Sequence, residues 1–187
     1  MTKLDADSKD RILQAALAER AVLAGWLNPA DIPFSLILRE MCAQNSCGQY
    51  GTSWMGPPAI GPVSELTERV RAYSDGLVIQ TVYQLEDSFD YPGMLEAKAE
   101  HKAVFLEILA DLRQKFPVET AGLLALDAGC CNICDPCSYP GEPCRLPGEA
   151  ISAVEAYGIN VNGMLSLCGL KYNNGRDTVS FVGLILF

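Results

Sequence analysis

Hydrophobic residues recur at helical intervals in four parts of the chain. Asp7 and Ser8 are typical N-capping residues for a first helix that we expect to run to about residue 27. The clearest helical pattern covers residues 94–116, where apolar side chains recur at intervals of three and four. These apolar positions are Phe105, Ile108, Leu109, Leu112 and Phe116. Shorter helices are expected after Ser64 and over residues 149–157.

Three stretches rich in β-branched and apolar residues predict strands at residues 34–39, 77–83 and 120–126. Because helices are expected between them, the middle of the chain has the order β-α-β-α-β, and right-handed crossovers would make these strands parallel. Asn174-Gly175 is a strong turn signal that predicts a C-terminal β-hairpin, which adds antiparallel strands. The predicted fold class is therefore α/β with a mixed sheet.

The length of 187 residues fits one domain, and no linker divides the chain. We expect a single metal-binding domain over residues 1–187, with the N-terminal helix inside residues 1–30. A loop rich in cysteine, proline and glycine spans residues 129–147 and would lie at the carboxyl edge of the sheet. The apolar tail, residues 181–187, is expected as a central strand; the alternative is that it packs across the interface of a homo-oligomer.

Composition narrows the function classes. The formal charge of −9 argues against binding nucleic acid or an anionic membrane, because both need a basic surface. One histidine excludes any site that needs two or three imidazoles. The first ten residues are too charged for a secretory signal, and no apolar run approaches the roughly 18 residues of a membrane span. We therefore expect a cytoplasmic protein whose eight cysteines are reduced.

The densest group of cysteines is Cys131, Cys134, Cys137 and Cys144, with the spacing C-x2-C-x2-C-x6-C. Three thiolates two residues apart, closed by a fourth just downstream, are typical of a [4Fe–4S] cluster, and C-x2-C-x2-C opens the bacterial ferredoxin motif. Zinc is the main alternative, because four thiolates also satisfy tetrahedral zinc, singly or in a binuclear cluster. A disulfide or a purely structural role is the remaining interpretation.

A second, weaker group is Cys42 and Cys47, which follow the first predicted strand. Cys130 follows the third, so parallel strands would bring these three cysteines to the same carboxyl edge, where they could form a second metal site. The alternative is that Cys42 and Cys130 are small buried hydrophobic residues. Cys168 is expected to pack in the core.

Two residues are candidates for contact with a cofactor. Arg145 directly follows the last cysteine of the motif, where a cation would stabilise an anionic cluster; alternatively it pairs with Glu142. Trp54 lies among breakers and would either cover a site or anchor its loop. His101 is expected at the edge of the apolar face of its helix, hydrogen-bonded. The acidic residues between 86 and 90 are expected to form a solvated turn.

Several separated motifs resemble a known family. They are Cys42-Ala-Gln-Asn-Ser-Cys-Gly-Gln-Tyr-Gly-Thr-Ser-Trp with Pro57-Pro58, Gly129-Cys-Cys-Asn-Ile-Cys-Asp-Pro-Cys, Pro143-Cys-Arg-Leu-Pro and Glu155-Ala-Tyr-Gly-Ile-Asn-Val. Together, from about residue 39 to residue 187, they resemble DUF2284, predicted cysteine-rich metal-binding proteins of anaerobic bacteria and archaea. The resemblance implies metal binding by an iron–sulfur cluster and no settled reaction.

One position departs from the family pattern. The family usually has a cysteine just before the Pro-Pro pair, and this chain has Gly56 there. If the family binds a second cluster at this point, three outcomes are open. The chain has lost that cluster, it uses Cys130 in place of the missing ligand, or it leaves one iron open to another ligand.

The resulting expectation is an iron–sulfur protein that transfers electrons, or performs cluster-dependent chemistry, in anaerobic metabolism. Its expected partner is a redox protein with a basic docking surface, because the chain is acidic. One alternative is a zinc-binding adaptor whose metal folds the cysteine-rich loop. Another is an enzyme that uses an open metal position near Cys42, Cys47 and Trp54.

Overall fold

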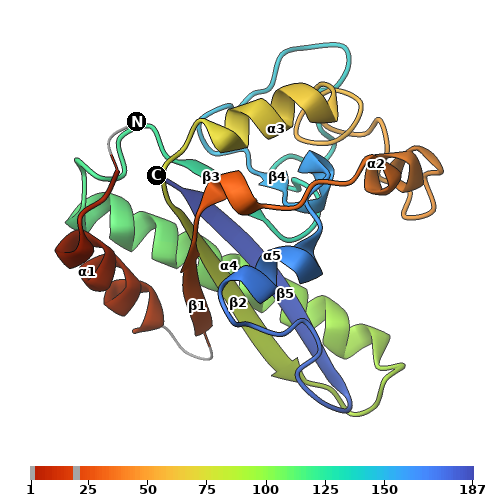
Figure 1. Cartoon of the computed structure of the whole chain (residues 1–187). Coiled ribbons are helices and arrows are strands. Elements are labelled where there is room, and N and C mark those ends of the chain that lie inside the picture. The colour runs from red at the N-terminus through yellow and green to blue at the C-terminus, as the bar shows by residue number, and fades with distance from the viewer. Residues whose placement is uncertain (1–2, 19–21) are drawn as a thin grey trace.

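A mixed five-stranded sheet forms the centre of the computed structural model, which describes residues 3–18 and 22–187. The strands of this described part are β1 (Val22–Leu27), β2 (Gly76–Gln84), β3 (Leu124–Asp127), β4 (Ser152–Ala153) and β5 (Thr178–Leu186). Their order across the sheet is β1-β2-β5-β3-β4, so the C-terminal strand lies in the middle (Figure 1). The expected α/β class and the central place of the tail are both confirmed.

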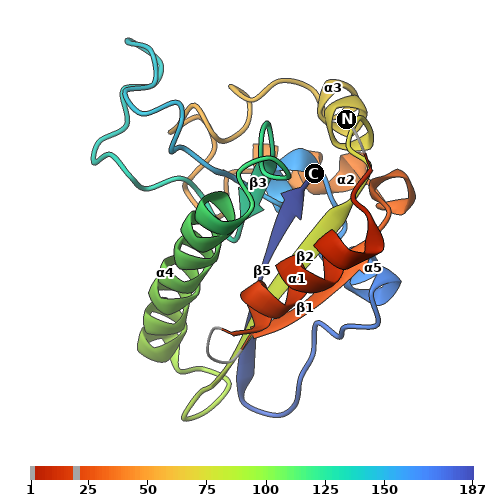
Figure 2. The same ribbon diagram turned by 90° about the vertical axis from the view of Figure 1, so that its left-hand side faces the viewer.

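Helices cover both faces of the sheet. They are α1 (Ala6–Leu17), α2 (Leu36–Ala43), α3 (Val63–Arg71), α4 (Tyr91–Lys115) and α5 (Val161–Leu167), with 3-10 turns η1 (Pro29–Asp31) and η2 (Glu155–Tyr157). The α1 and α4 helices pack on one face (Figure 2). The α3 and α5 helices and η2 pack on the other. The expected long helix is thus confirmed as α4, and the helix after Ser64 as α3.

The two central strands are buried on both sides. In β2, Leu77 and Ile79 face α1 and α4, whereas Val78 faces α3 and α5. In β5, Ile185 and Leu184 alternate in the same way. Because each face of the sheet has its own apolar layer, hydrophobic residues from both faces follow one another in the last part of β5, Leu184–Leu186.

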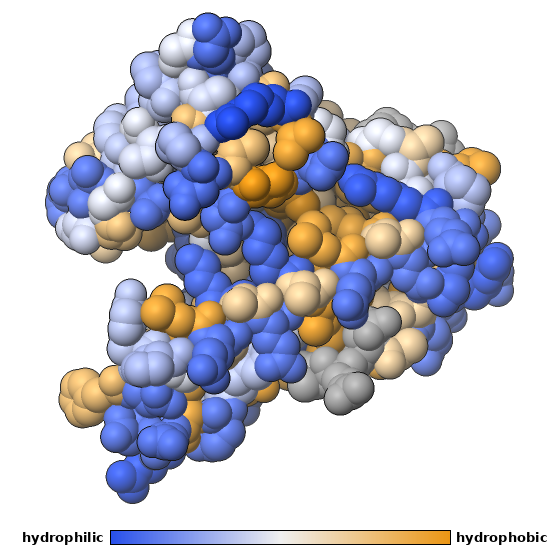
Figure 3. Space-filling view, turned by 180° about the vertical axis from the view of Figure 1, so that it is seen from behind, coloured by the Kyte–Doolittle hydropathy of each residue, from blue (hydrophilic) through white to orange (hydrophobic). Residues whose placement is uncertain are grey.

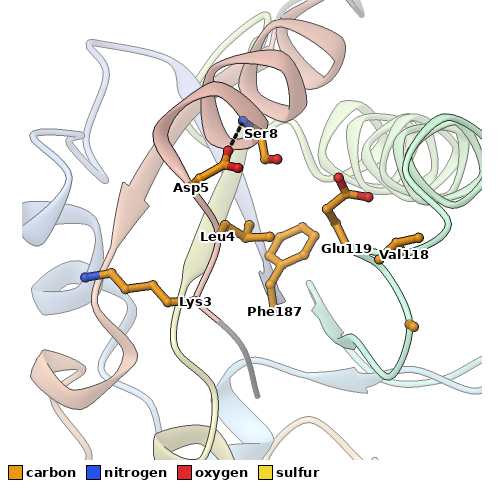
Figure 4. A pocket seen from close by; sticks show the side chains of 8 residues that line it. Lys3, Leu4, Asp5, Ser8, Val118, Glu119 and Phe187 are labelled. Carbon is orange, nitrogen blue, oxygen red and sulfur yellow. Dashed lines mark hydrogen bonds between the residues drawn. The ribbon is translucent and has the colours of Figure 1, made fainter.

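The first helix is shorter than expected. It ends at Leu17, and residues 22–27 form β1, which pairs antiparallel with β2. This segment contains Gly25 and Trp26, and pairing with a buried strand outweighs the weak helical pattern of the isolated segment. The N-cap is Asp5, which accepts a hydrogen bond of 2.7 Å from the Ser8 amide (Figure 4). Residues 19–21 of the predicted helix lie outside the described part.

The segment at residues 34–39 is also different from the prediction. Phe34 makes only an isolated bridge with Ile159, and the chain then enters α2. Leu36 and Ile37 are 67% and 65% exposed, so the apolar pattern that predicts a buried strand belongs to an exposed first helical turn. Short apolar runs do not distinguish strand from helix by periodicity alone.

The predicted parallel β-α-β-α-β order is confirmed only in part. The second and third predicted strands, β2 and β3, run in the same direction, because both are antiparallel to β5. They are not neighbours, because β5, from the far end of the chain, lies between them. The first predicted strand is absent, β1 pairs antiparallel with β2, and β3–β4 is the parallel pair.

The prediction of a C-terminal hairpin is wrong. The residues directly before Asn174-Gly175 form no strand, because α5 ends at Leu167 and a loop leads from it to β5. Asn174 stabilises this loop by donating hydrogen bonds to the Lys171 carbonyl and the Ser180 hydroxyl.

The predictions for residues 149–157 and 120–126 need smaller corrections. Residues 149–157 form β4 and η2 instead of one helix. β3 begins only at Leu124, because Thr120 still bonds back to the end of α4.

The surface seen from the α4 side is indented, and hydrophobic residues gather near its centre (Figure 3). A pocket of about 380 Å³ lies elsewhere, between Leu4, Val118 and the C-terminal Phe187 (Figure 4). Its described lining residues include no cysteine, so it is separate from the chemistry considered below. Within residues 3–18 and 22–187, no helix has both the length and the apolar character needed to span a membrane.

Gly183 in β5 is expected to tolerate no side chain. A Cβ placed there would lie 2.3 Å from Cε2 of Phe105, which is fully buried between α4 and the sheet. We expect Gly183→Ala to lower the free energy of unfolding by about 1–3 kcal/mol, the usual cost of overpacking a core. Chemical denaturation measures this change. Gly148→Ala is the matched control, because no atom lies within 4 Å of its added Cβ; equal midpoints for the two variants would contradict the packing described.

Candidate metal centre

The cysteine-rich loop leaves the sheet at the carboxyl end of β3. Gly129 turns the chain there with a φ of 76°, and Cys130 and Cys131 follow directly. The loop then lies beside the segment that connects α2 to α3 (Figures 1 and 2). Lys102 connects α4 to this loop by donating a hydrogen bond of 2.5 Å to the Asn132 side chain.

The structure brings the four cysteines of the C-x2-C-x2-C-x6-C motif to one small cavity of about 20 Å³. Trp54 and Arg145, the two residues expected near a cofactor, also line it. The remaining walls are mostly apolar, and the cavity is lined by Ser53, Trp54, Met55, Cys131, Ile133, Cys134, Cys137, Ser138, Cys144, Arg145, Leu146 and Ala150. Four thiols on one cavity form a soft donor set suited to iron or zinc.

Trp54 both lines this cavity and anchors the loop. Its indole Nε1 donates a hydrogen bond of 2.9 Å to the Glu142 carbonyl, and its ring meets Tyr139 edge-on at 4.9 Å. The interpretation that Trp54 anchors a loop thus agrees with these contacts, and a role in covering a cofactor stays a prediction. Beside it, the hydroxyl of Ser53 is buried without a hydrogen-bond partner among the described residues.

Arg145 bonds within the loop, where its guanidinium donates to the Pro136 carbonyl. The described ion pairs do not include the alternative pair with Glu142. The pKa of the Cys137 thiol is lowered, first by the backbone N–H groups of Tyr139 and Trp54 and to a smaller extent by the charge of Arg145. The same donors would stabilise a thiolate that binds a metal.

Opposite pKa shifts distinguish Cys137 from Cys42. Burial raises the pKa of Cys42, and Arg39 offsets this only in part. In metal-free protein at about pH 7.5, we expect iodoacetamide to alkylate Cys137 several-fold faster than Cys42, because the thiolate is the reactive form. The difference should shrink as the pH rises above the pKa of Cys42. Mass spectrometry of the two peptides measures both rates, and faster alkylation of Cys42 would contradict these electrostatics.

The second group of cysteines also comes together, although the strand expected to lead to it does not exist. Cys42 lies in the last turn of α2, Cys47 in the loop after it, and Cys130 at the end of β3. All three line a second cavity of about 230 Å³. Its other lining residues are Gln49, Tyr50, Met55, Gly56, Pro57, Lys98, Gly129, Ala153, Glu155 and Ala156.

The charged residues that line this second cavity are Lys98 and Glu155, and Arg39 holds the helix that carries Cys42. Arg39, on the same helix as Cys42, donates to the carbonyls of Ala156 and Gly61 and so joins α2 to η2. The Glu155 side chain is open to the cavity, but the surrounding protein limits its hydration and raises its pKa, and Asp127 adds to this shift. The wall as a whole is built from four separate parts of the chain, residues 42–57, Lys98, residues 129–130 and residues 153–156.

A buried polar contact supports the start of the loop. His101 of α4 is 1% exposed; its Nδ1 lies 2.8 Å from the Thr81 hydroxyl, and its Nε2 lies 3.0 Å from Oδ1 of Asp127. Asp127 ends β3, and the same Oδ1 accepts a hydrogen bond from the Ala128 amide. His101 is thus hydrogen-bonded as expected, but it lies in the interior and not at an edge.

Sequence reasoning did not connect Asp127 with His101. The signal in the sequence is an aspartate at the end of an apolar strand, two residues before Gly129-Cys130-Cys131.

Two other predicted positions also have their place in the fold. Cys168 packs against the core, as expected. In the acidic turn, Asp90 caps α4 through the Gly93 amide.

The described residues show no group of three or more histidine, cysteine, aspartate and glutamate side chains placed to hold a single metal ion. Around one zinc ion, thiolate sulfurs at about 2.3 Å from the metal are about 3.8 Å apart. A polynuclear cluster takes one thiolate on each iron, so its ligands surround a larger volume.

Comparison with known families gives a match over most of the chain. The family model described as "Predicted metal-binding protein (DUF2284)" matches residues 25–187, which include all eight cysteines. The same comparisons found no matching curated protein and no matching solved structure.

Proposed function

Because the chain belongs to the DUF2284 family of predicted metal-binding proteins, we propose that it is an iron–sulfur protein that transfers electrons in anaerobic metabolism. Cys131, Cys134, Cys137 and Cys144 would hold one [4Fe–4S] cluster. The observation that carries this proposal is that these four thiols line one cavity, with no imidazole among its described walls.

The donor set fits such a cluster. Thiolate is its usual ligand, and apolar walls such as Ile133 and Leu146 limit the access of water. The cavity itself is small, since about 10–15 Å³ on this measure holds one water molecule. The loop must therefore open outward to receive a cluster, and its residues Asn132, Asp135 and Pro136 are exposed, so no overlying part of the protein opposes this movement.

A bound cluster would supply a one-electron donor and acceptor close to the surface. Trp54 would cover it on one side, and Arg145 would offset part of its negative charge and raise its reduction potential. The partner would be a redox protein with a basic docking surface, because this chain carries a net charge of −9. Exposure of the loop would make the cluster sensitive to oxygen, which accords with an anaerobic role.

The test is to purify the protein anaerobically and to quantify iron, acid-labile sulfide and zinc in the same sample. We expect iron and sulfide in equal amounts, at about four or more of each per chain, and reversible bleaching of the visible absorption by dithionite. Stoichiometric zinc with iron and sulfide absent would overturn the proposal and favour a zinc adaptor.

A further inference from the structure

The second cavity contains a partial ligand set with no assigned role. Three thiols line it, those of Cys42, Cys47 and Cys130. Cys42 comes from α2, Cys47 from the loop after it and Cys130 from the loop that follows β3. The α2 helix is held in place because Arg39 bonds to two carbonyls outside it. Thiols from two distant parts of the chain thus meet on one cavity and provide three of the four ligands that a thiolate-bound cluster uses.

Of the two glycines that line this cavity, Gly56 is the one with room for a side chain, because an added Cβ on Gly129 would lie 2.8 Å from Cε of Lys98. Gly56 lines the same cavity and has no side chain. A Cβ placed on it would approach only Ser53, whose Oγ would lie 3.3 Å away. A larger residue therefore fits with a small adjustment, and the absence of a side chain leaves space beside the three thiols.

Charge in the cavity indicates the kind of ligand that this space would take. Lys98 lines the wall close to Gly129, where an added Cβ would lie 2.8 Å from the lysine Cε. Lys98 forms none of the ion pairs of the described residues, but its charge acts on the carboxyl of Glu155, which lines the same cavity, so a ligand there would meet both groups. A cation next to an open metal position favours a small anion.

We propose that Cys42, Cys47 and Cys130 bind a second iron–sulfur cluster with one iron free of protein ligands, and that a small organic anion binds this iron beside Lys98. This cavity, at about 230 Å³, is much larger than the first, at about 20 Å³. The inference extends the proposed electron-transfer role by adding a binding site. It concerns different cysteines, so it can fail while the first cluster is retained.

The two sites are direct neighbours. Cys130 lines the second cavity and Cys131 lines the first, so adjacent residues would bind different clusters. Met55 also lines both cavities. Consecutive Cα atoms are about 3.8 Å apart, which places the two clusters close enough for their unpaired electrons to interact.

Metal content tests the ligand assignment. Anaerobically reconstituted wild-type protein is expected to hold about eight irons per chain, and Cys47→Ser about four, because only the second cluster is lost. Cys47 is exposed, so this substitution should not disturb folding. A matched Cys134→Ser variant should lose the first cluster and keep the second. Wild-type protein with about four irons, unchanged in Cys47→Ser, would overturn the inference and leave the proposed function intact.

Electron paramagnetic resonance tests the neighbouring arrangement and the open iron. When both clusters are reduced, we expect broadening by spin–spin interaction that disappears in Cys47→Ser. Cyanide, a small anionic iron ligand, should shift the wild-type spectrum and leave that of Gly56→Cys unchanged, because the added thiolate would complete the ligand set. An identical cyanide response in both proteins would contradict an open position at Gly56.

Binding of an organic anion is tested with malonate labelled with carbon-13. Coupling of the label to the reduced second cluster is expected in the wild type. Lys98→Gln should weaken binding about tenfold or more, the loss expected when a charged hydrogen bond is removed. Lys115→Gln is the control, because Lys115 lies at the far end of α4 and pairs with Asp111. No coupling, or equal affinity in the two variants, would overturn the assignment of the ligand.

Discussion

Cys134→Ser is expected to remove about four irons and four sulfides per chain from anaerobically reconstituted protein. Cys134 is the central thiol of the motif and lines the first cavity together with its three partners. A serine hydroxyl is a harder and much less acidic donor than a thiol, so it replaces a thiolate poorly on iron. Iron and sulfide analysis, with the visible spectrum, measures the loss.

Cys168→Ser is the matched control for this variant. Cys168 packs against the apolar core and lies next to Gly25 of β1, at the opposite edge of the sheet from β3 and β4. Its substitution should leave the iron content unchanged, with at most a small loss of stability. A Cys134→Ser protein that retains its full iron content would remove Cys134 from the ligand set.

Asp127→Ala is expected to lower the free energy of unfolding by about 3 kcal/mol, the upper end of the cost of leaving a buried polar group without a partner. His101 would keep its hydrogen bond with Thr81 but would lose the carboxylate 3.0 Å from its Nε2. The Ala128 amide would lose its acceptor as well. The variant should therefore also hold its cluster less tightly, because this turn begins the cysteine-rich loop.

Chemical denaturation of metal-free protein measures the change in the free energy of unfolding. The rate at which a chelator removes iron measures how tightly the variant holds its cluster. Glu86→Ala is the control, since it removes a carboxylate side chain that is exposed and should change the stability by about 0.5 kcal/mol or less. Equal stability of the Asp127→Ala and Glu86→Ala proteins would contradict the buried contact with His101.

The elements that sequence alone predicts are those whose pattern is long and local. The α4 helix repeats its apolar positions over many turns, and β2 is a continuous run of buried residues, so both are recognisable without knowledge of their neighbours. The tail is apolar throughout, which is the pattern of a central strand buried on both faces.

The elements that the sequence alone does not predict depend on pairing with distant parts of the chain. The strand β1 exists because β2 is available to pair with it, and Gly25 lies directly opposite Val78. The antiparallel order follows from the insertion of β5 between β2 and β3, which no local pattern encodes. The turn signal at Asn174-Gly175 is real as a turn, but the strand after it pairs with distant strands.

The candidate site likewise has parts that the sequence predicts and parts that depend on the packed structure. The four cysteines of the main motif are close in sequence, so their convergence is predictable from spacing alone. Cys42 and Cys47 reach Cys130 through a helix and a loop, and the strand that suggested this meeting is absent. The contact between His101 and Asp127 depends on how α4 crosses β3, which only the packed structure establishes.

The central claim is that Cys131, Cys134, Cys137 and Cys144 hold one [4Fe–4S] cluster. The most direct measurement is the Mössbauer spectrum of iron-57 reconstituted into a variant in which Cys42, Cys47 and Cys130 are replaced by serine. We predict the diamagnetic, valence-delocalised doublet of an oxidised [4Fe–4S] cluster, at about four irons per chain. The doublet of a single high-spin iron with four thiolates, or no iron beside stoichiometric zinc, would contradict the claim.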